Sequence, residues 1–173
     1  IAVDGKSVVE KTSKQLTDLL KGTAGTAVVL KVERPEVGEV EINVERAQIK
    51  VKNVPYFGMI NDITGYIKLT GFTPDAGKEV KDATVNLLDQ GAKQLILDLR
   101  GNGGGLLHEA VNIVNVYVDK GQEIVQTKGK EIENNRTYKT LNTPVDTEVP
   151  LTVLVDGGSA SASEIVSGSL QDL

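Results

Sequence analysis

Apolar residues recur with two different periods along the first part of the chain, and these periods predict its elements. Between residues 12 and 21, leucines fall at helical spacing ahead of a glycine, which is typical of a short helix. The run at 26–34 predicts a strand, and residues 38–50 alternate apolar and charged side chains, as a half-exposed strand does. With a further short strand at the start, these elements indicate a small β-rich module with one face in solvent.

After a boundary expected at residues 51–55, strands and helices alternate. Two strands, in 93–100 and 150–158, carry continuous apolar runs of the kind that is buried on both faces, and each leads into a glycine-rich turn followed by a helix. The other predicted elements are a strand at 65–72, a helix at 73–89 that Thr73 caps with Pro74 in its first turn, a helix at 106–121, a strand pair at 121–129 and 135–140, and a helix from 160 onward. This pattern predicts an α/β layout with ligand chemistry at the carboxyl ends of the strands.

Composition and charge narrow the class of protein. The chain of 173 residues has 39% hydrophobic and 25% charged residues, which is typical of a folded globular protein. Aromatic residues make up only 3%, so the core must be built from valine, leucine, isoleucine and alanine. No apolar run reaches the roughly 20 residues of a membrane-spanning helix. A net charge of −5 with no basic stripe argues against a nucleic acid as the partner.

The absence of cysteine excludes disulfides, thiolate metal sites and cysteine nucleophiles. A Ser-His-Asp triad would have to use His108, the single histidine, which lies inside a predicted helix with only Glu109 as an adjacent carboxylate. We therefore disfavour a histidine-based triad; for a serine hydrolase without a usable histidine, a lysine base is a known option. Both ends of the chain have the character of interior segments, so the sequence is expected to be truncated at both ends.

The first glycine-rich turn, at residues 101–105, precedes a predicted helix. Its glycines allow positive φ angles and let a ligand approach backbone amides at a helix N-terminus. A phosphate loop is one interpretation, but neither the G-x-G-x-x-G pattern nor a Gly-Lys-Ser/Thr sequence is present. The remaining interpretations are a tight strand-to-helix turn and an oxyanion hole, in which amides stabilise negative charge on a carbonyl oxygen.

The second turn carries three serines in the sequence "GGSASASEI". Ser161 and Glu164 have the spacing of a capping box, and in that interpretation Ser159 and Ser163 are solvated small residues. The alternative is that Ser161 is a nucleophile at a strand-to-helix turn, with the Ala162 amide aimed at an oxyanion. The strict G-x-S-x-G nucleophile pattern is absent, so an α/β-hydrolase site is disfavoured.

The two turns together resemble those of a known family. "LDLRGNGGG" and "SASASEI" occur in the same order in the carboxyl-terminal processing, or tail-specific, serine proteases. The resemblance covers residues 58–173 and implies a serine protease core, incomplete at its C-terminus, with an α/β (α+β) fold similar to crotonase and ClpP. Residues 1–36 resemble the back half of a PDZ domain, and residues 37–57 would be the connecting strand and linker.

The resemblance also implies a site and a mechanism. Ser161 would be the nucleophile of a Ser–Lys dyad whose lysine lies beyond Leu173. The amide of Ala162 and that of Gly103 or Gly104 would form the oxyanion hole. Three polar residues would support the site: Asp98, Arg100 and Glu164.

By the same resemblance, the protein would cleave unfolded or tagged proteins near their carboxyl termini through an acyl-enzyme, and it would bind their C-terminal peptides. It would need no metal or other cofactor and no nucleic acid. It would work in the bacterial cell envelope, in the periplasm or outside the cell. Two alternatives stay open from the residues alone: a protease-like domain that binds peptides without turnover, and crotonase-like acyl-CoA chemistry, which also uses an oxyanion hole built from two amides.

Overall fold

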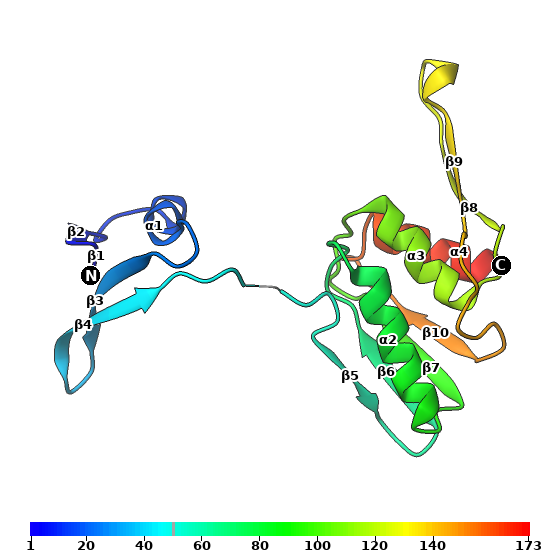
Figure 1. The fold of residues 1–173 in the computed structure, drawn as a ribbon, viewed down its shortest axis with the longest axis horizontal. Helices are drawn as coiled ribbons and strands as arrows, with labels where there is room; N and C mark the ends of the chain where they lie inside the picture. Colours follow the sequence, from blue (N-terminus) through cyan, green and yellow to red (C-terminus); the bar gives the residue numbers. More distant parts are fainter. Residues whose placement is uncertain (50) are drawn as a thin grey trace. The chain divides into compact units, whose positions relative to one another are not determined.

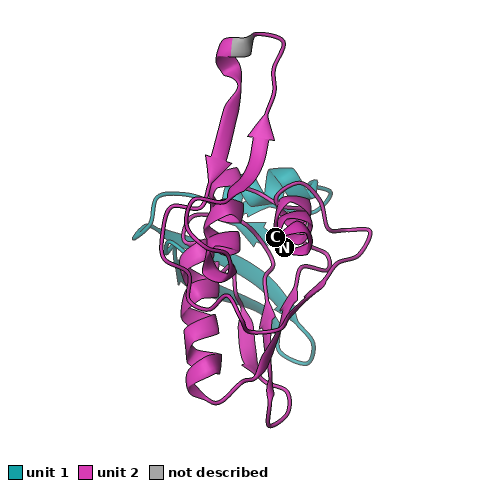
Figure 2. Cartoon of the chain, turned by 90° about the vertical axis from the view of Figure 1, so that its right-hand side faces the viewer, with its two compact units in different colours: residues 1–50 teal, residues 51–173 magenta. Residues whose placement is uncertain are grey.

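The computed structural model describes residues 1–49 and 51–173, and the chain forms two compact units, residues 1–50 and 51–173 (Figure 2). This division lies immediately before the boundary expected at 51–55. Each unit has its own four-stranded sheet. No helix in the described residues is both long and apolar enough to span a bilayer.

The first unit is an antiparallel sheet with one short helix (Figure 1). Its strands lie in the order β2-β1-β3-β4. Their bounds are β1 Ala2–Val3, β2 Lys6–Ser7, β3 Ala27–Arg34 and β4 Gly38–Glu45, and the helix α1 spans Ser13–Leu20. The helix and strands predicted for this part of the chain are thus confirmed, except that β4 ends at Glu45, short of the predicted 38–50, and residue 50 lies outside the described residues. Thr12 caps α1 by accepting the Gln15 amide at 3.3 Å.

Strand β4 belongs to the sheet of the first unit and is not a connecting strand. It pairs with β3 over its full length of eight residues. The Arg46 guanidinium then donates to the carbonyl oxygen of Leu20, at the end of α1, at 2.8 Å and to that of Ala27, at the start of β3, at 2.9 Å. Part of the expected connecting segment, residues 37–57, is therefore placed in this unit, because pairing with β3 satisfies backbone groups that a linker would leave in solvent.

The second unit is a mixed α/β domain built on a sheet in the order β10-β7-β6-β5. The strands β10, β7 and β6 are parallel, and β5 at the edge is antiparallel. β8 and β9 form a separate hairpin that projects from the body of the unit (Figure 1). The bounds are β5 Tyr56–Met59, β6 Thr64–Lys68, α2 Ala76–Asp89, β7 Gln94–Asp98, α3 Leu107–Tyr117, β8 Glu123–Thr127, a 3-10 turn Ile132–Asn134, β9 Arg136–Lys139, β10 Leu151–Leu154 and α4 Ala162–Asp172. The predicted alternation of strands and helices is confirmed.

The apolar core of the second unit lies where α2 and α3 cover one face of the sheet (Figure 1). Leu95 and Leu97 of β7 and Ile67 of β6 each expose 1% or less of their surface. The intervening positions point to the opposite face and include the polar residues Lys68 and Asp98. The expectation that both apolar strands are buried on two faces is wrong for β10, an edge strand without a fully buried residue. In β7, Asp98 on the opposite face exposes only 1% of its surface and Ile96 is half-buried, so this strand is largely covered on both faces.

The first turn of α2 is held by a carboxylate from α3, and the predicted threonine cap is wrong. Asp75, with a φ of 75°, is the residue before the helix. Thr73 donates its amide and its hydroxyl to Asn53 Oδ1, each at 2.9 Å. The Glu109 carboxylate accepts the amides of Asp75 and Gly77 at 3.1 and 2.8 Å. A carboxylate is favourable at the positive end of a helix, and this one also ties α3 to α2.

Gly77 marks a close approach of α2 and α3, which a pair of glycine substitutions tests. A Cβ on Gly77 would lie 2.5 Å from Asn112 Cβ, whereas a Cβ on Gly168 in α4 would meet nothing within 4 Å. We expect Gly77→Ala to lower the free energy of unfolding by about 1–3 kcal/mol through overpacking, although alanine is the better helix former. The matched change Gly168→Ala should raise it by up to about 1 kcal/mol. Urea unfolding curves measure both effects, and equal effects would contradict the close helix contact.

Candidate functional site

Two turns leave the sheet side by side at the carboxyl ends of two neighbouring strands. β7 and β10 are parallel neighbours with Asp98 opposite Leu154, and each strand ends at that residue. The glycine-rich turn, residues 99–106, follows β7, and the serine turn, residues 155–161, follows β10. Both turns therefore emerge at the edge of the sheet where the sequence predicts ligand chemistry.

The two turns touch at Gly104. A Cβ on this glycine would lie 2.7 Å from the Ala160 carbonyl oxygen, 2.9 Å from the Ala162 nitrogen and 2.9 Å from Ser161 Cβ. Its φ of 96° also lies in the left-handed region that favours glycine. A side chain has no room at this position. The structure thus brings together three residues that the sequence pointed to: Gly104, Ser161 and Ala162.

Ser161 has an unusual backbone conformation for a residue other than glycine. Its φ of 55° and ψ of −112° lie outside the regions that side chains readily adopt, and strain of this kind concentrates at functional sites. The residue is exposed and lies directly before α4. The Glu164 carboxylate accepts the Ser161 amide at 2.6 Å, so the capping role predicted for Glu164 is confirmed.

The two outer serines are bonded into the fold, and the interpretation that they are solvated is wrong. The Ser159 hydroxyl donates to the Leu99 carbonyl oxygen at 2.8 Å. The Ser163 hydroxyl is completely buried and donates to the Asn102 carbonyl oxygen at 2.8 Å. Each hydroxyl satisfies a carbonyl group of the glycine-rich turn, which explains why a small polar residue is needed at both positions.

Asn102 connects both turns to the sheet, and sequence reasoning assigned it no role. Its side chain donates to the Leu69 carbonyl oxygen at 3.0 Å and accepts the Gly104 amide at 3.0 Å. Its own carbonyl oxygen accepts the Ala160 amide at 3.2 Å in addition to the Ser163 hydroxyl. The signal in the sequence was a side chain that can both donate and accept, placed among the four glycines of residues 101–105.

A buried carboxylate with two cationic partners lies at the end of β7. Asp98 exposes 1% of its surface. It accepts hydrogen bonds from Tyr66 Oη at 2.6 Å, Lys68 Nζ at 3.1 Å and Arg100 Nη2 at 2.6 Å. The hydrogen bonds from the Arg100 side chain hold the pKa of Asp98 well below its usual range, although burial acts in the opposite direction. Asp98 is therefore suited to fixing the turn and not to taking a proton from a substrate.

Sequence reasoning singled out Asp98 and Arg100 but missed Tyr66 and Lys68. Lys68 lies directly opposite Asp98 in the parallel pairing of β6 with β7. Tyr66 and Lys68 are separated by one apolar residue in β6, so they lie on the same face of the sheet. This alternation was the signal in the sequence that could have identified them. The Lys68 ammonium also donates to the Arg100 carbonyl oxygen at 2.7 Å. Its protons are thus directed at the glycine-rich turn, and it is not placed as a base for a serine.

Asp156 joins the two turns at the surface. Its Oδ1 accepts the Gly101 amide at 2.8 Å from the glycine-rich turn and the Gly158 amide at 2.9 Å from the serine turn. These two backbone hydrogen bonds lower the pKa of Asp156. The carboxylate therefore stays ionised at neutral pH and keeps the turns together from the solvent side.

The first turn of α4 leaves one backbone amide of the described residues without an acceptor. The amides on either side of it are taken, because Ser161 donates to Glu164 and Ser163 donates to the Ala160 carbonyl oxygen at 3.1 Å. The Ala162 amide has no acceptor within the described residues. It belongs to the positive end of the helix, where unpaired amides favour negative charge. This is the amide that the resemblance places in an oxyanion hole.

In the glycine-rich turn, the two glycines expected as oxyanion donors differ. The Gly104 amide donates to Asn102 Oδ1 and is occupied. In the part of the chain that the structure describes, the amides of Gly103 and Gly105 have no acceptor. Gly105 is held against Phe72, whose carbonyl oxygen would lie 2.6 Å from a Cβ on Gly105. Gly103 and Gly105 flank Gly104, so two amides without an acceptor adjoin the contact with the serine turn.

His108 is not placed as a base for Ser161. Its side chain is 64% exposed in the first turn of α3, and its Nε2 lies 3.6 Å from Glu109 Oε1. That carboxylate is already bonded to amides at the start of α2. Among the described residues, no group of three or more histidine, cysteine, aspartate or glutamate side chains could hold a metal ion.

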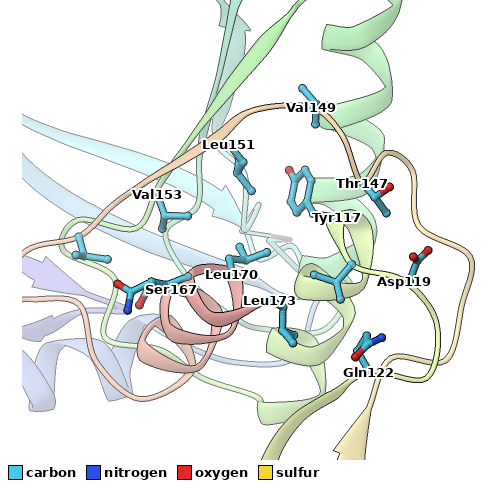
Figure 3. Close-up of a pocket in the computed structure, with 13 residues that line it drawn as sticks. Tyr117, Asp119, Gln122, Thr147, Val149, Leu151, Val153, Ser167, Leu170 and Leu173 are labelled. Atoms are coloured by element: carbon cyan, nitrogen blue, oxygen red, sulfur yellow. The ribbon is translucent and has the colours of Figure 1, made fainter.

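A pocket of about 690 Å³ lies along β10 but does not contain this site (Figure 3). Its walls include Leu151 and Val153 from β10, Leu170 from α4 and Tyr117 from α3. None of the site residues predicted from the sequence lines it. The candidate chemistry therefore lies at the two turns, around the exposed Ser161.

Comparisons with known proteins agree on one family. Residues 63–173 match the family model of peptidase family S41. The chain is 37% identical over 174 residues to the carboxy-terminal processing protease CtpA of Bacillus subtilis (strain 168), which covers 99% of this chain and 36% of that protein. It is similar to the solved structure of a photosystem II D1 C-terminal processing protease, with a TM-score of 0.62, 28% identity, and coverage of 99% of this chain and 48% of that one. A lipoprotein from Streptococcus agalactiae shares the fold over 70% of this chain and 47% of its own, at a TM-score of 0.52 and 19% identity. The chain thus spans about a third of the length of the curated relative.

The Asp98 network predicts a stability that depends on pH. Because the folded-state pKa is depressed, the carboxylate stabilises the fold above its unfolded-state pKa of about 3.9 and loses this contribution as the pH falls below that value. We expect Asp98→Asn to lower the free energy of unfolding by about 2–4 kcal/mol at neutral pH and by about 1 kcal/mol less at about pH 3, with the rest of the deficit lost only as the pH falls further, through the folded-state pKa. The control Asp82→Asn, which removes an exposed ion pair with Lys78, should change it by less than about 1 kcal/mol. Urea unfolding at both pH values measures this, and a deficit that does not shrink in acid would contradict it.

Proposed function

Because this chain belongs to peptidase family S41, we propose that it carries the nucleophile of a serine endopeptidase that cleaves proteins near their carboxyl termini. One observation carries the proposal: the exposed Ser161, held at positive φ, lies against Gly104 and directly precedes Ala162, whose amide has no acceptor within the described residues. All three residues lie within the segment 63–173 that matches the family. The relatives named as carboxy-terminal processing proteases support the same reaction.

In the proposed reaction, Ser161 Oγ attacks the scissile carbonyl carbon, and its proton passes to a lysine that acts as general base. The carbon–nitrogen bond then breaks, the leaving amine takes the proton from the lysine, and an ester remains on Ser161. Water, deprotonated by the same lysine, hydrolyses the ester and frees the enzyme. As the family resemblance implies, we place this lysine outside residues 1–173, because the Lys68 ammonium is bonded to Asp98 and to the glycine-rich turn.

We assign the oxyanion hole to the amides of Ala162 and Gly105. The sequence favoured Gly103 or Gly104 as the second donor. The Gly104 amide is bonded to Asn102, and of its two neighbours we choose Gly105 because it is held against Phe72, whereas a Cβ on Gly103 would meet nothing within 4 Å. Amides that are already in place for the developing negative charge need no reorganisation during the reaction, and each typically contributes about 10²–10³-fold to kcat.

The three supporting residues act on the backbone of the turns in this proposal. Glu164 holds the amide of Ser161 and so stabilises its strained conformation. Asp98 accepts the Arg100 amide at 2.9 Å and the Arg100 side chain, which fixes the start of the glycine-rich turn. None of the three needs to touch the substrate for this role.

The proposal extends to substrate and location. The proposed substrate class is an unfolded or tagged protein with an accessible C-terminal peptide; the name of the relative, a carboxy-terminal processing protease, supports a protein substrate processed at its C-terminus. We propose that the first unit is the back half of a PDZ-like peptide-binding domain in which β4 is one of the strands. The likeness to a Streptococcus agalactiae lipoprotein supports a place in the cell envelope.

Replacing the proposed nucleophile in the full-length protease tests this function. Ser161→Ala should reduce cleavage of a disordered protein with an apolar C-terminal tail by at least about 10³-fold, because no acyl-enzyme can form. The control is Ser167→Ala, which removes a hydroxyl bonded to the Glu164 carbonyl oxygen at 3.3 Å and should cleave at the wild-type rate. Gel electrophoresis follows cleavage, and circular dichroism verifies that both variants are folded.

Unchanged cleavage by Ser161→Ala, or an equal loss in the control, would contradict the assignment. Substrate binding by the wild type without turnover would favour a peptide-binding module. Calorimetric binding of a CoA thioester would favour crotonase-like chemistry.

A further inference from the structure

We propose that Asn102 is a positioning residue, which sets the two oxyanion amides at the right distance and orientation from Ser161. The inference rests on the proposed function and deepens it by naming a residue that touches no substrate. Asn102 is completely buried and makes hydrogen bonds to the sheet, to its own turn and to the serine turn.

The side chain of Asn102 connects the sheet to the glycine-rich turn. Its Nδ2 donates to the carbonyl oxygen of Leu69, the residue after β6, at 3.0 Å, and its Oδ1 accepts the Gly104 amide at 3.0 Å. Gly104 in turn lies against Ser161, whose Cβ would be 2.9 Å from a Cβ on the glycine. One side chain thus fixes the point at which the two turns touch.

The backbone of Asn102 connects the same turn to the serine turn. Its carbonyl oxygen accepts the Ala160 amide at 3.2 Å and the Ser163 hydroxyl at 2.8 Å. These two residues flank the pair Ser161 and Ala162 in the sequence. The proposed nucleophile and the proposed oxyanion amide are therefore held on both sides by one carbonyl group.

An asparagine side chain matches both of its partners in this space. Leu69 offers an acceptor and Gly104 a donor, so the residue between them must donate and accept from one short planar group. Because the side chain is completely buried, substitution by alanine leaves two backbone groups unsatisfied. A carboxylate would instead place an oxygen against the Leu69 carbonyl group.

Holding the Gly104 amide also supplies rigidity that glycines lack. Gly104 and Gly105 have φ angles of 96° and 153°, and neither has a side chain that would hold it there. With the Gly104 amide bonded to Asn102, the Gly105 amide stays available next to the contact with Ser161. Loss of the Asn102 side chain would let this peptide segment reorient and would misplace the second oxyanion donor.

Kinetics of the full-length protease separate positioning from folding. Asn102→Ala should lower kcat by about 10²–10³-fold, the loss typical of one oxyanion donor, with KM within about threefold of the wild type. The matched control is Asn115→Ala, because Asn115 is also buried and its side chain accepts the Leu141 and Asn142 amides at 3.1 and 2.7 Å in another part of the unit. Both variants should lower Tm, but only Asn102→Ala should lower kcat of the folded enzyme.

A second variant, Asn102→Asp, adds a measurement, the pH dependence of kcat, that would not change if Asn102 only stabilised the fold. A protonated carboxyl group has one donor and one acceptor and can replace both bonds of the amide, whereas a carboxylate cannot. Burial opposite the Leu69 carbonyl group raises the pKa of such a carboxyl group. The ratio of variant to wild-type kcat, measured on folded protein, should therefore rise about tenfold from about pH 8 to about pH 6.

Amide hydrogen exchange tests the geometry without relying on catalysis. The Gly104 amide should exchange at least about tenfold faster in Asn102→Ala than in the wild type, and at the wild-type rate in Asn115→Ala. If Asn102→Ala does not fold, Ser163→Ala removes only the hydroxyl bond to the Asn102 carbonyl group and should lower kcat by about 5–10-fold.

Two results would overturn the proposal: a kcat for folded Asn102→Ala within about threefold of that for Asn115→Ala, or unchanged exchange of the Gly104 amide. A wild-type protease that cleaves nothing would contradict the proposed function instead. The exchange rates would then still decide whether Asn102 holds the turn.

Discussion

The parallel pairing of β7 with β10 is the constraint on which the candidate site depends. Because Asp98 lies opposite Leu154, the two strands end together, and the turns that follow them start about 4.8 Å apart. The two turns meet at Gly104, where a Cβ would lie 2.7–2.9 Å from atoms of residues 160–162, so this position has no room for a side chain.

At this contact, the polar group that is buried is neutral, and the charged group lies at the surface, because burying a charge is costly. The neutral amide of Asn102 holds the turns from the inside, and the Asp156 carboxylate holds them from the solvent side. A buried unpaired charge would cost far more than a buried amide with its hydrogen bonds made. Asp98 is the buried carboxylate of the site, and Arg100 and Lys68 compensate it. Among the described residues, no buried side-chain polar atom lacks a hydrogen-bond partner.

The order of elements and the two turns could be predicted because period, glycines and apolar runs are local signals. What failed depends on partners that are distant in the sequence. Thr73 was expected to cap α2, but its amide and hydroxyl donate hydrogen bonds to Asn53, 20 residues earlier in the sequence. The roles of Asn102 and Lys68 follow from which strands are neighbours, and no local pattern contains that information. Periodicity likewise identified β4 as a strand but could not reveal that it pairs with β3.

The helix cap and the proposed nucleophile are compatible roles for Ser161. A helix begins with several unpaired amides, and an uncapped end could bind an anion in more than one orientation. In α4, Glu164 takes the amide of Ser161 and the Ala160 carbonyl group takes that of Ser163, so within the described residues the Ala162 amide remains without an acceptor. The capping hydrogen bonds therefore leave one unpaired amide at this helix end to attract negative charge, and that amide lies next to the exposed serine. This amide, in a fixed place, supplies one of the two donors of the proposed oxyanion hole, and the glycine-rich turn supplies the other.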